Sequence, residues 1–147
     1  MAEPAVRRLT LADRAQWAAL RHALWPHHAV AELGAELPAL LNGAFAGFGA
    51  FGGETLVGFA EVSERGYGDG CDTAPVAWLE GIYVAPDYRR GGVARSLVEA
   101  TMDWAKAAGY AELGSDAAID NLVSRLSHAR WGFEETRRSV MFRKVLT

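Results

Sequence analysis

A strand-like run, a glycine turn and an amphipathic stretch, in that order, most constrain the fold of this chain. Residues 76–84 read VAWLEGIYV, the segment richest in β-branched and aromatic side chains. Residues 88–95 read YRRGGVAR, and from Val93 apolar residues recur at helical spacing until Gly109 ends the pattern. The chain is therefore predicted to pass from a strand through a glycine turn into a helix, a unit typical of α/β folds.

The remaining elements are predicted from the same periodicities. Thr10 and Asp13 form a capping-box pattern before a helix that ends at Pro26. Within strand 76–84, Val76, Trp78, Glu80, Ile82 and Val84 share one face if the strand is regular, and Glu80 is the polar exception. The other expected elements are a strand at 5–11, an interrupted helix at 30–41, a hairpin over 44–65, a short strand at 110–116, a helix at 121–131 and a final strand at 134–146.

Length and composition limit the classes of protein to which the chain can belong. With 147 residues, 50% of them hydrophobic, one core can form, and we expect a single domain over residues 1–147. The 15 Lys and Arg against 18 Asp and Glu leave a net charge of −3, which argues against nucleic acid or an anionic membrane as a partner. Apolar runs fall short of the roughly 18–20 residues of a membrane span, and no signal-peptide pattern starts the chain. We expect a soluble cytoplasmic protein.

Metal and disulfide chemistry have few ligands in this sequence. Cys71 is the only cysteine, which excludes an internal disulfide and a cysteine-rich zinc site. The four histidines, at positions 22, 27, 28 and 128, lack the spacing of a metal motif. No metal centre is expected.

The arginine and glycine turn is a candidate anion site. A helix start presents unpaired N–H groups and a partial positive charge, and Gly91 and Gly92 leave room for a phosphate to approach them. Arg89, Arg90 and Arg95 add local cations. Neither the Walker pattern nor the dinucleotide pattern GxGxxG is present, so a nucleoside triphosphate or NAD is not expected. The alternative, a solvated turn with ordinary surface arginines, stays open on this stretch alone.

Several blocks resemble a known family. RRGGVA (89–94) resembles the [RQ]-x-x-G-x-[GA] acetyl-CoA signature of the GNAT N-acetyltransferase superfamily. LRHALWPHH (20–28), GCDTAPVAWLEGIYV (70–84), ELGSDAAIDN (112–121) and GFEET (132–136) resemble the aminoglycoside 6′-N-acetyltransferases within it. The resemblance implies a mixed central sheet of six to seven strands flanked by about four helices. It also implies acetyl transfer from acetyl-CoA to the 6′-amino group of an aminoglycoside by direct amine attack, and hence antibiotic resistance.

The same resemblance assigns the acetyl-CoA contacts. The backbone of Ile82, Tyr83 and Val84 would pair with the pantetheine arm, and Asn121 would hydrogen-bond that arm near the thioester, although Asn121 could equally cap its own helix. The pyrophosphate would be held by Arg89, Arg90, Gly91, Gly92, Val93, Ala94 and Arg95.

Two carboxylates are expected in the acceptor cleft. Glu80 and Asp116 would recruit a cationic amine first and act as general base second, because a nearby negative charge favours the ammonium form of the substrate. For Asp116, capping of the following helix is the alternative. Aromatic faces suit sugar rings and cations, so Trp25 and Tyr67, with His28 beside them, are expected to line the sugar pocket. Core packing is the alternative for Trp25.

Three departures from the family pattern leave alternatives open. His128 stands where many members have a tyrosine that protonates the leaving thiolate, and helix packing is its alternative role. Arg137 stands where an acidic residue would contact the drug, which keeps another small amine or polyamine open as the acceptor. The short C-terminal segment predicts an exposed sheet edge covered by a second subunit, and hence a homodimer. A non-catalytic acyl-CoA-binding module is the third hypothesis, disfavoured by the acids in the cleft.

Overall fold

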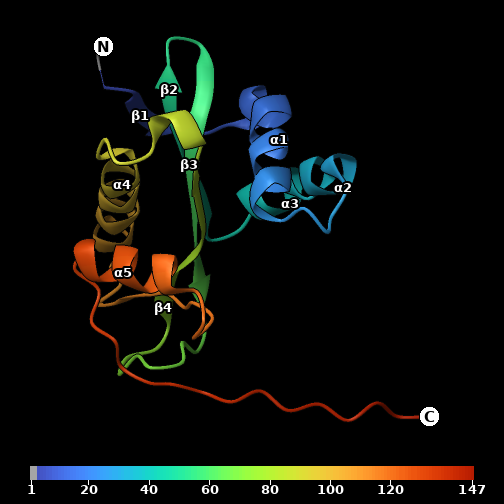
Figure 1. Ribbon diagram of the computed structural model, residues 1–147, viewed down its shortest axis with the longest axis vertical. Coiled ribbons are helices and arrows are strands. Elements are labelled where there is room, and N and C mark those ends of the chain that lie inside the picture. Colours follow the sequence, from blue (N-terminus) through green and yellow to red (C-terminus); the bar gives the residue numbers. More distant parts are fainter. Residues whose placement is uncertain (1–2) are drawn as a thin grey trace.

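In the computed structural model, which describes residues 3–147, helices cover both faces of a mixed sheet (Figure 1). Strands β1 (Ala5–Arg8), β2 (Phe45–Gly52), β3 (Thr55–Arg65) and β4 (Val76–Val84) form an antiparallel meander. The fifth strand, β5 (Leu113–Gly114), pairs with β4 in parallel. This architecture confirms the α/β fold class.

Two groups of helices lie on opposite sides of the sheet (Figure 1). One group is α1 (Arg14–Leu24), α2 (Val30–Ala35) and α3 (Leu37–Leu41), and the other is α4 (Val93–Ala107) and α5 (Leu122–Arg130). The interrupted helix expected over 30–41 is divided into α2 and α3, and the other predicted helices are confirmed. Short 3-10 turns, η1 (Leu11–Asp13) and η2 (Pro86–Tyr88), precede α1 and α4.

The predicted helix boundaries follow local chemistry. The Thr10 hydroxyl accepts a hydrogen bond from the Ala12 N–H, and the Asp13 carboxylate accepts one from the Thr10 N–H, so the capping box is confirmed. Gly109, after α4, has φ of +90°, and Gly132, after α5, has φ of +92°. Glycine tolerates this left-handed backbone, which explains why both helices end there.

Each sheet face carries its own apolar core. Ala50, Val57, Leu79 and Val84 of the sheet pack against α4, whose Leu97 is fully buried. The opposite core joins α1 and α3 to the sheet through Leu9, Trp17, Leu37, Phe45, Phe51, Leu56 and Phe59. Both faces of the sheet are thus covered, so a ligand can reach the sheet backbone only at an unpaired strand edge.

Arg21 and Glu61 form a buried ion pair that the sequence analysis did not anticipate. Arg21 Nε lies 2.8 Å and Nη2 3.1 Å from the two Glu61 carboxylate oxygens, and Trp17 Nε1 donates to the same carboxylate at 2.9 Å. Arg21 Nη1 also donates to the Leu33 carbonyl at 2.8 Å. These bonds connect α1 to β3 and α2, and they satisfy the charges that burial leaves without water.

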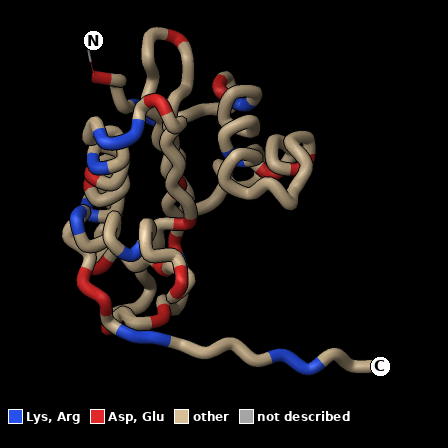
Figure 2. The backbone as a smooth tube through the Cα atoms, viewed as in Figure 1, with Lys and Arg blue, Asp and Glu red and all other residues tan. Residues whose placement is uncertain are grey.

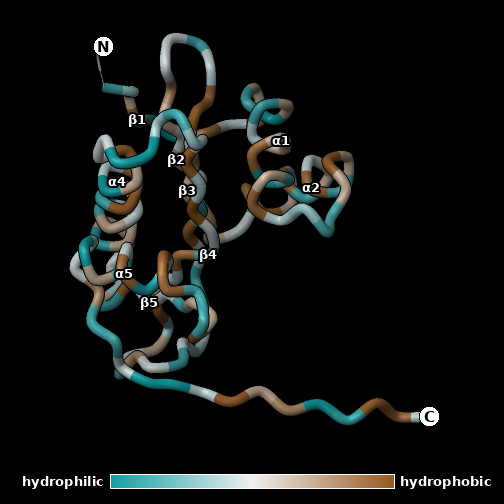
Figure 3. Tube along the Cα trace, in the orientation of Figure 1, coloured by the Kyte–Doolittle hydropathy of each residue, from teal (hydrophilic) through white to brown (hydrophobic). Residues whose placement is uncertain are grey.

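The prediction of a final strand was wrong, and with it the count of six to seven strands. Residues 134–147 form no helix or strand, and the sheet has five strands among the described residues. This C-terminal tail runs away from the body of the molecule, and its apolar residues come in two groups, 140–142 and 145–146 (Figure 3). A strand needs a neighbour to satisfy its backbone, and β5, only two residues long, offers the tail no edge of useful length.

No helix within residues 3–147 is long and apolar enough to cross a membrane. In the same part of the chain, no group of three or more His, Cys, Asp or Glu side chains could hold a metal ion.

Candidate active site

A β-bulge at Glu80 shapes the centre of the candidate site. Glu61 pairs with Gly81 and Val62 with Leu79, so Glu80 has no partner on β3. The extra residue reverses the alternation of β4. Val84 therefore packs toward α4 whereas Trp78 does not, and the prediction that 76, 78, 80, 82 and 84 share a face was wrong.

Beyond the bulge, β4 has an open edge on the side of β5. The two strands pair only at Ala77 and Trp78, so the edge from Leu79 to Val84 has no strand beside it. Ala85 N–H donates to Val57 of β3 at 2.8 Å, which directs the Val84 carbonyl to the open edge.

Main-chain groups alternate between the two edges of a strand. Ile82 and Val84 therefore face the open edge, whereas the backbone of Tyr83 faces β3. Of the three residues expected to pair with an extended ligand, the geometry thus favours Ile82 and Val84.

The turn between β4 and α4 presents free amides. Gly92 is the N-cap of α4 with φ of +85°, and no side chain caps the helix. The first intrahelical bond runs from the Ser96 N–H to the Gly92 carbonyl at 3.1 Å, which leaves the N–H groups of Val93, Ala94 and Arg95 for an anion. A Cβ at Gly92 would meet nothing within 4 Å, so the approach to these amides is open.

The three arginines of this turn differ in what they contact. Arg89 Nε donates to the Val84 carbonyl at 2.7 Å, and its guanidinium lies 5.5 Å from the Tyr83 ring. Arg95 Nη2 donates to the Arg130 carbonyl at the end of α5, at 2.5 Å. Arg90, with φ of +66°, makes no side-chain hydrogen bond or ion pair with residues 3–147. Arg90 is thus the arginine of this turn whose guanidinium has no partner within residues 3–147, and Figure 2 shows basic residues at the start of α4.

The Glu80 carboxylate is held by two neighbours from β3. Arg65 Nη2 donates to Oε1 at 2.6 Å and Nε to Oε2 at 3.0 Å, while the Ser63 hydroxyl donates to Oε2 at 2.6 Å. The Arg65 guanidinium also lies 4.4 Å from the centre of the Trp78 ring. Glu80 therefore enters the cleft in a fixed orientation, because an arginine fork defines the carboxylate plane.

The other predicted acids surround the same arginine. The pKa of Arg65 is raised, first by its hydrogen bonds to Glu80 and further by the charges of Asp116 and Asp69. Asn121 is the N-cap of α5, accepting from the Ser124 N–H at 3.1 Å, so the alternative role of Asp116 as its cap is contradicted. Glu80, Asp116 and Asp69 thus lie near Arg65 and form one acidic group, the region expected from the sequence to be the acceptor cleft.

Trp25, at the end of α1, borders this cleft. A Cβ at Gly81 would lie 2.6 Å from the Trp25 ring, so the absence of a side chain beside Glu80 makes room for the indole. Trp25 also packs against Phe59 at 6.2 Å, centre to centre, and is only partly buried. Trp25 thus contributes to the core and keeps part of its side chain exposed. Tyr67, 67% exposed on the loop after β3, offers a second aromatic surface.

Together, an open strand edge, a glycine-capped helix start and an acidic cleft form an arrangement that can hold an extended anionic thioester next to a cationic amine. The sequence of the chain matches the Acetyltransferase (GNAT) family over residues 8–133. The chain belongs to the GNAT acetyltransferase family.

Relatives within the GNAT family are similar over nearly their whole length. The chain is 45% identical to aminoglycoside N(6′)-acetyltransferase type 1 of Serratia marcescens over 135 residues, covering 88% of this chain and 91% of that protein. Identity to the enzyme of the same name from Stenotrophomonas maltophilia is 42% over 146 residues, covering 97% and 94%. The predicted resemblance to aminoglycoside 6′-N-acetyltransferases is confirmed.

Solved GNAT structures are also similar. AAC(6′)-Iy, in complex with the bisubstrate analogue CoA-S-monomethyl-acetylneamine, superposes with a TM-score of 0.92 at 35% identity, covering 99% of this chain and 100% of that one. AAC(6′)-Ih from Acinetobacter baumannii superposes with a TM-score of 0.88 at 37% identity, covering 97% and 99%.

The structure shows the contacts of the two histidines that the sequence singled out, His128 and His28. His128 Nδ1 lies 2.7 Å from the Ser124 carbonyl, to which it must donate, and Nε2 lies 2.7 Å from the Ser115 hydroxyl. Its ring contacts Trp131 and Phe133, as the packing alternative predicts. The exposed His28 follows α1, with its N–H donating to the Trp25 carbonyl at 3.2 Å and its own carbonyl 2.7 Å from His22 Nδ1. Its place in the wall of the sugar pocket stays a prediction.

Ser63 and Arg65 were not among the site residues predicted from the sequence. Both lie near the end of β3, and only the pairing of β3 with β4 brings them to Glu80. The sequence could have indicated them, because polar residues on β3 opposite Glu80, the one acid in β4, are expected to contact it across the two strands. Cys71, in the loop after β3, is not a nucleophile candidate, because burial, with Glu112 and Asp72 nearby, raises the pKa of its thiol.

Proposed function

We propose that this GNAT protein transfers the acetyl group of acetyl-CoA to the 6′-amino group of aminoglycoside antibiotics and thereby confers resistance. The observation that carries the proposal is the acidic cleft around Glu80 at the inner end of the open β4 edge. The cytoplasm supplies acetyl-CoA, so the proposal includes that location.

The donor would lie along β4. Acetyl-CoA supplies an activated acetyl group and a thiol leaving group. Ile82 and Val84 would bond its extended arm as a neighbouring strand would, and the amides of residues 93–95, with Arg90, would hold its pyrophosphate. Arg89 and Arg95 would hold the pyrophosphate-binding turn in place through their hydrogen bonds to the Val84 and Arg130 carbonyls. Asn121 would contact the arm with its amide N–H₂ group while its carbonyl caps α5.

The acceptor would enter from the acidic side. Glu80 and Asp116 would attract the ammonium groups of the drug, and Trp25 and Tyr67 would contact its sugar ring. Attack requires the neutral amine, so one ammonium proton must leave before the N–C bond forms. The C–S bond then breaks, the nitrogen gives up a second proton, and the thiolate takes up a proton to leave as the thiol of CoA. Glu80, held by Arg65 and Ser63, is the group we propose to accept the first ammonium proton through a water molecule.

The test measures thiol release from acetyl-CoA with kanamycin, tobramycin, spermidine and no acceptor. Neomycin and paromomycin form a matched pair, because paromomycin carries a hydroxyl in place of the 6′-amine. We expect turnover with kanamycin and neomycin, and mass spectrometry should place the acetyl group on the 6′-nitrogen. Equal turnover of neomycin and paromomycin would contradict 6′ transfer. Turnover with spermidine alone would favour the second candidate, a different polyamine, for which Arg137 is the specific observation.

We also propose that the protein works as a homodimer. Val140, Met141, Phe142, Val145 and Leu146 of the tail are between 68% and 90% exposed, which is unusual for a run of apolar residues. Valine and phenylalanine are common in strands, so a second subunit would pair with the tail. Sedimentation should show a dimer that deletion of residues 139–147 converts to a monomer. A full-length monomer at all concentrations would contradict this.

A further inference from the structure

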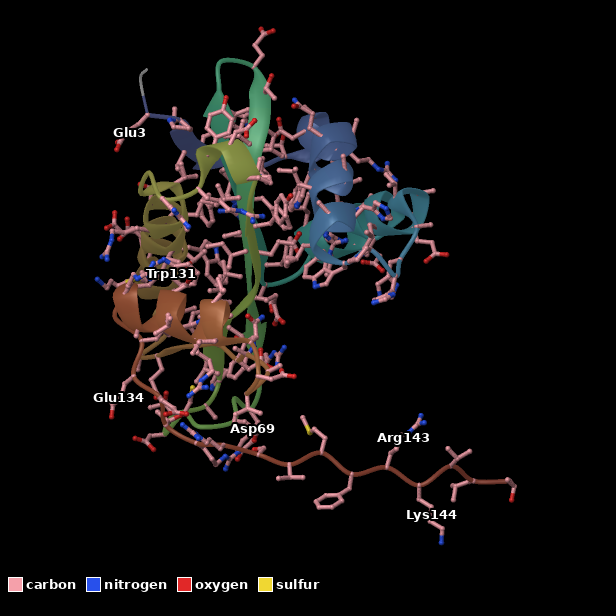
Figure 4. All side chains as sticks on the ribbon, in the orientation of Figure 1. Glu3, Asp69, Trp131, Glu134, Arg143 and Lys144 are labelled. Carbon is pink, nitrogen blue, oxygen red and sulfur yellow. The ribbon has the colours of Figure 1, made fainter. Side chains whose placement is uncertain are left out.

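Arg137, at the start of the C-terminal tail, lies against the acidic loop of the cleft. Its Nη2 donates a hydrogen bond to Asp69 Oδ1 on the loop after β3. The Tyr67 hydroxyl, followed by the Asp69 charge, raises the pKa of the Arg137 guanidinium. Figure 4 shows Asp69 where the tail passes under this loop, and Figure 2 shows the basic start of the tail beside acidic loop residues.

The loop backbone is shaped to receive this part of the tail. Gly70 has φ of +82°, and a Cβ there would overlap the Thr136 hydroxyl and lie 4.0 Å from the Arg137 Cβ. Packing at Gly70 therefore supports the placement of Arg137 independently of the ion pair. A side chain at position 70 would push the tail off the loop.

Arg137 and Arg65 are both cations of the acidic cleft, but they are held differently. Arg65 makes two hydrogen bonds to Glu80 and stacks on Trp78. The Arg65 and Arg137 side chains are similarly exposed, 43% and 49%, but Arg137 makes one charged hydrogen bond, to an Asp69 that is 69% exposed, whereas Glu80 is 24% exposed. Since an exposed ion pair is worth little in water, an ammonium group of a substrate can displace Arg137 but not Arg65.

We infer that Arg137 is a specificity-determining residue, a built-in cation that covers Asp69 until an acceptor ammonium replaces it. The inference rests on the proposed function and concerns the same cleft. Its consequence is selective: an acceptor with several ammonium groups must compete with Arg137, whereas an amino sugar with one amine has no second charge to place on Asp69. Arg137 thus weakens the binding of polycationic drugs and leaves the chemical step untouched.

The test compares KM values for kanamycin and for methyl 6-amino-6-deoxyglucoside. R137A should lower the KM for kanamycin by about two- to fivefold, the range of an exposed ion pair, and leave kcat and the monoamine KM unchanged. In the double variant R137A/D69N this decrease in the KM for kanamycin should vanish, because it arises from the exposure of the Asp69 carboxylate. R138A is the matched control, since Arg138 pairs with Glu135 inside the tail. A decrease retained in the double variant, or no decrease in R137A, would overturn the inference.

A second readout does not depend on the acceptor. If Asp69 holds Arg137, D69N should speed tryptic cleavage after Arg137 relative to cleavage after Arg143 on the outer tail (Figure 4). Equal relative rates in D69N and the unchanged protein would also overturn the inference. If no variant binds or acetylates kanamycin, the proposed acceptor is rejected, and the tryptic comparison alone decides whether Asp69 holds Arg137.

Discussion

Arg65 holds Glu80 by a two-pronged hydrogen bond, with Nη2 2.6 Å from Oε1 and Nε 3.0 Å from Oε2. This pair joins the end of β3 to the bulge of β4 at the centre of the candidate site. If the fork positions Glu80 for proton transfer, its loss should affect the chemical step more than substrate binding.

Arg65→Met and Arg65→Lys test this positioning role. We expect both variants to lower kcat by about tenfold, the cost of one charged hydrogen bond, with the KM for kanamycin unchanged or reduced. Lysine keeps the charge but cannot form the fork. Steady-state kinetics check the result, with Ser63→Ala expected to show a smaller loss. A normal kcat in Arg65→Lys would mean that charge alone matters.

Asp116→Asn separates recruitment from base chemistry. Asp116 accepts no side-chain hydrogen bond from residues 3–147 and contributes charge beside Arg65. We expect KM for kanamycin to rise by about fivefold with kcat spared, the pattern of lost ground-state binding. Asp120→Asn, an exposed change in the same segment, serves as the control. A collapse of kcat in Asp116→Asn would instead identify Asp116 as the base.

Gly92→Ala tests the glycine turn. Alanine at φ of +85° should destabilise the fold by about 1–2 kcal/mol and turn the free amides of α4 away from the pyrophosphate. Gly53→Ala is a matched control, with φ of +63° and open space around its Cβ, in the turn between β2 and β3. Both should lower Tm, but only Gly92→Ala should raise the KM for acetyl-CoA. An equal KM in both variants would argue against an anion seat at this turn.

Arg21→Met tests the buried ion pair. The variant leaves the Glu61 carboxylate buried with Trp17 as its remaining side-chain donor, so we expect a loss of about 3–5 kcal/mol in the free energy of unfolding. Calorimetry should show Tm lowered by roughly 10 °C. The double variant Arg21→Met/Glu61→Leu should recover much of the loss, since no unpaired charge remains. If the single variant were as stable as the parent, the ion pair would contribute nothing to the free energy of unfolding.

The stability of the N-terminal cap should depend on pH. Hydrogen bonds from Arg7 lower the pKa of Asp13, so the folded state favours the carboxylate. A lowered pKa contributes stability above the ordinary aspartate value of about 4, and that stability is lost as pH falls through the folded value. Urea unfolding at several pH values checks this. Asp13→Asn should be less stable at neutral pH and should lose less stability in acid than the parent.

Prediction from sequence succeeded where neighbouring residues decide the outcome. The Thr10 cap, the strand at 76–84 and the helix that ends at Gly109 follow from the preferences of a few adjacent residues. Prediction of the final strand failed because a strand needs a partner that lies elsewhere. The tail has the β-branched and aromatic residues of a strand, but it pairs with no strand among the described residues.

The sequence by itself determined the strand, glycine turn and helix, and thereby the GNAT family and a seat for an anion. Only the tertiary structure decided how the charges of the cleft are used. Register between β3 and β4 placed Arg65 on Glu80, and the path of the tail placed Arg137 on Asp69. The physical reason is that backbone conformation is set mainly by neighbours in the chain, whereas a charged side chain takes its partner from whatever segment folding brings within about 3 Å.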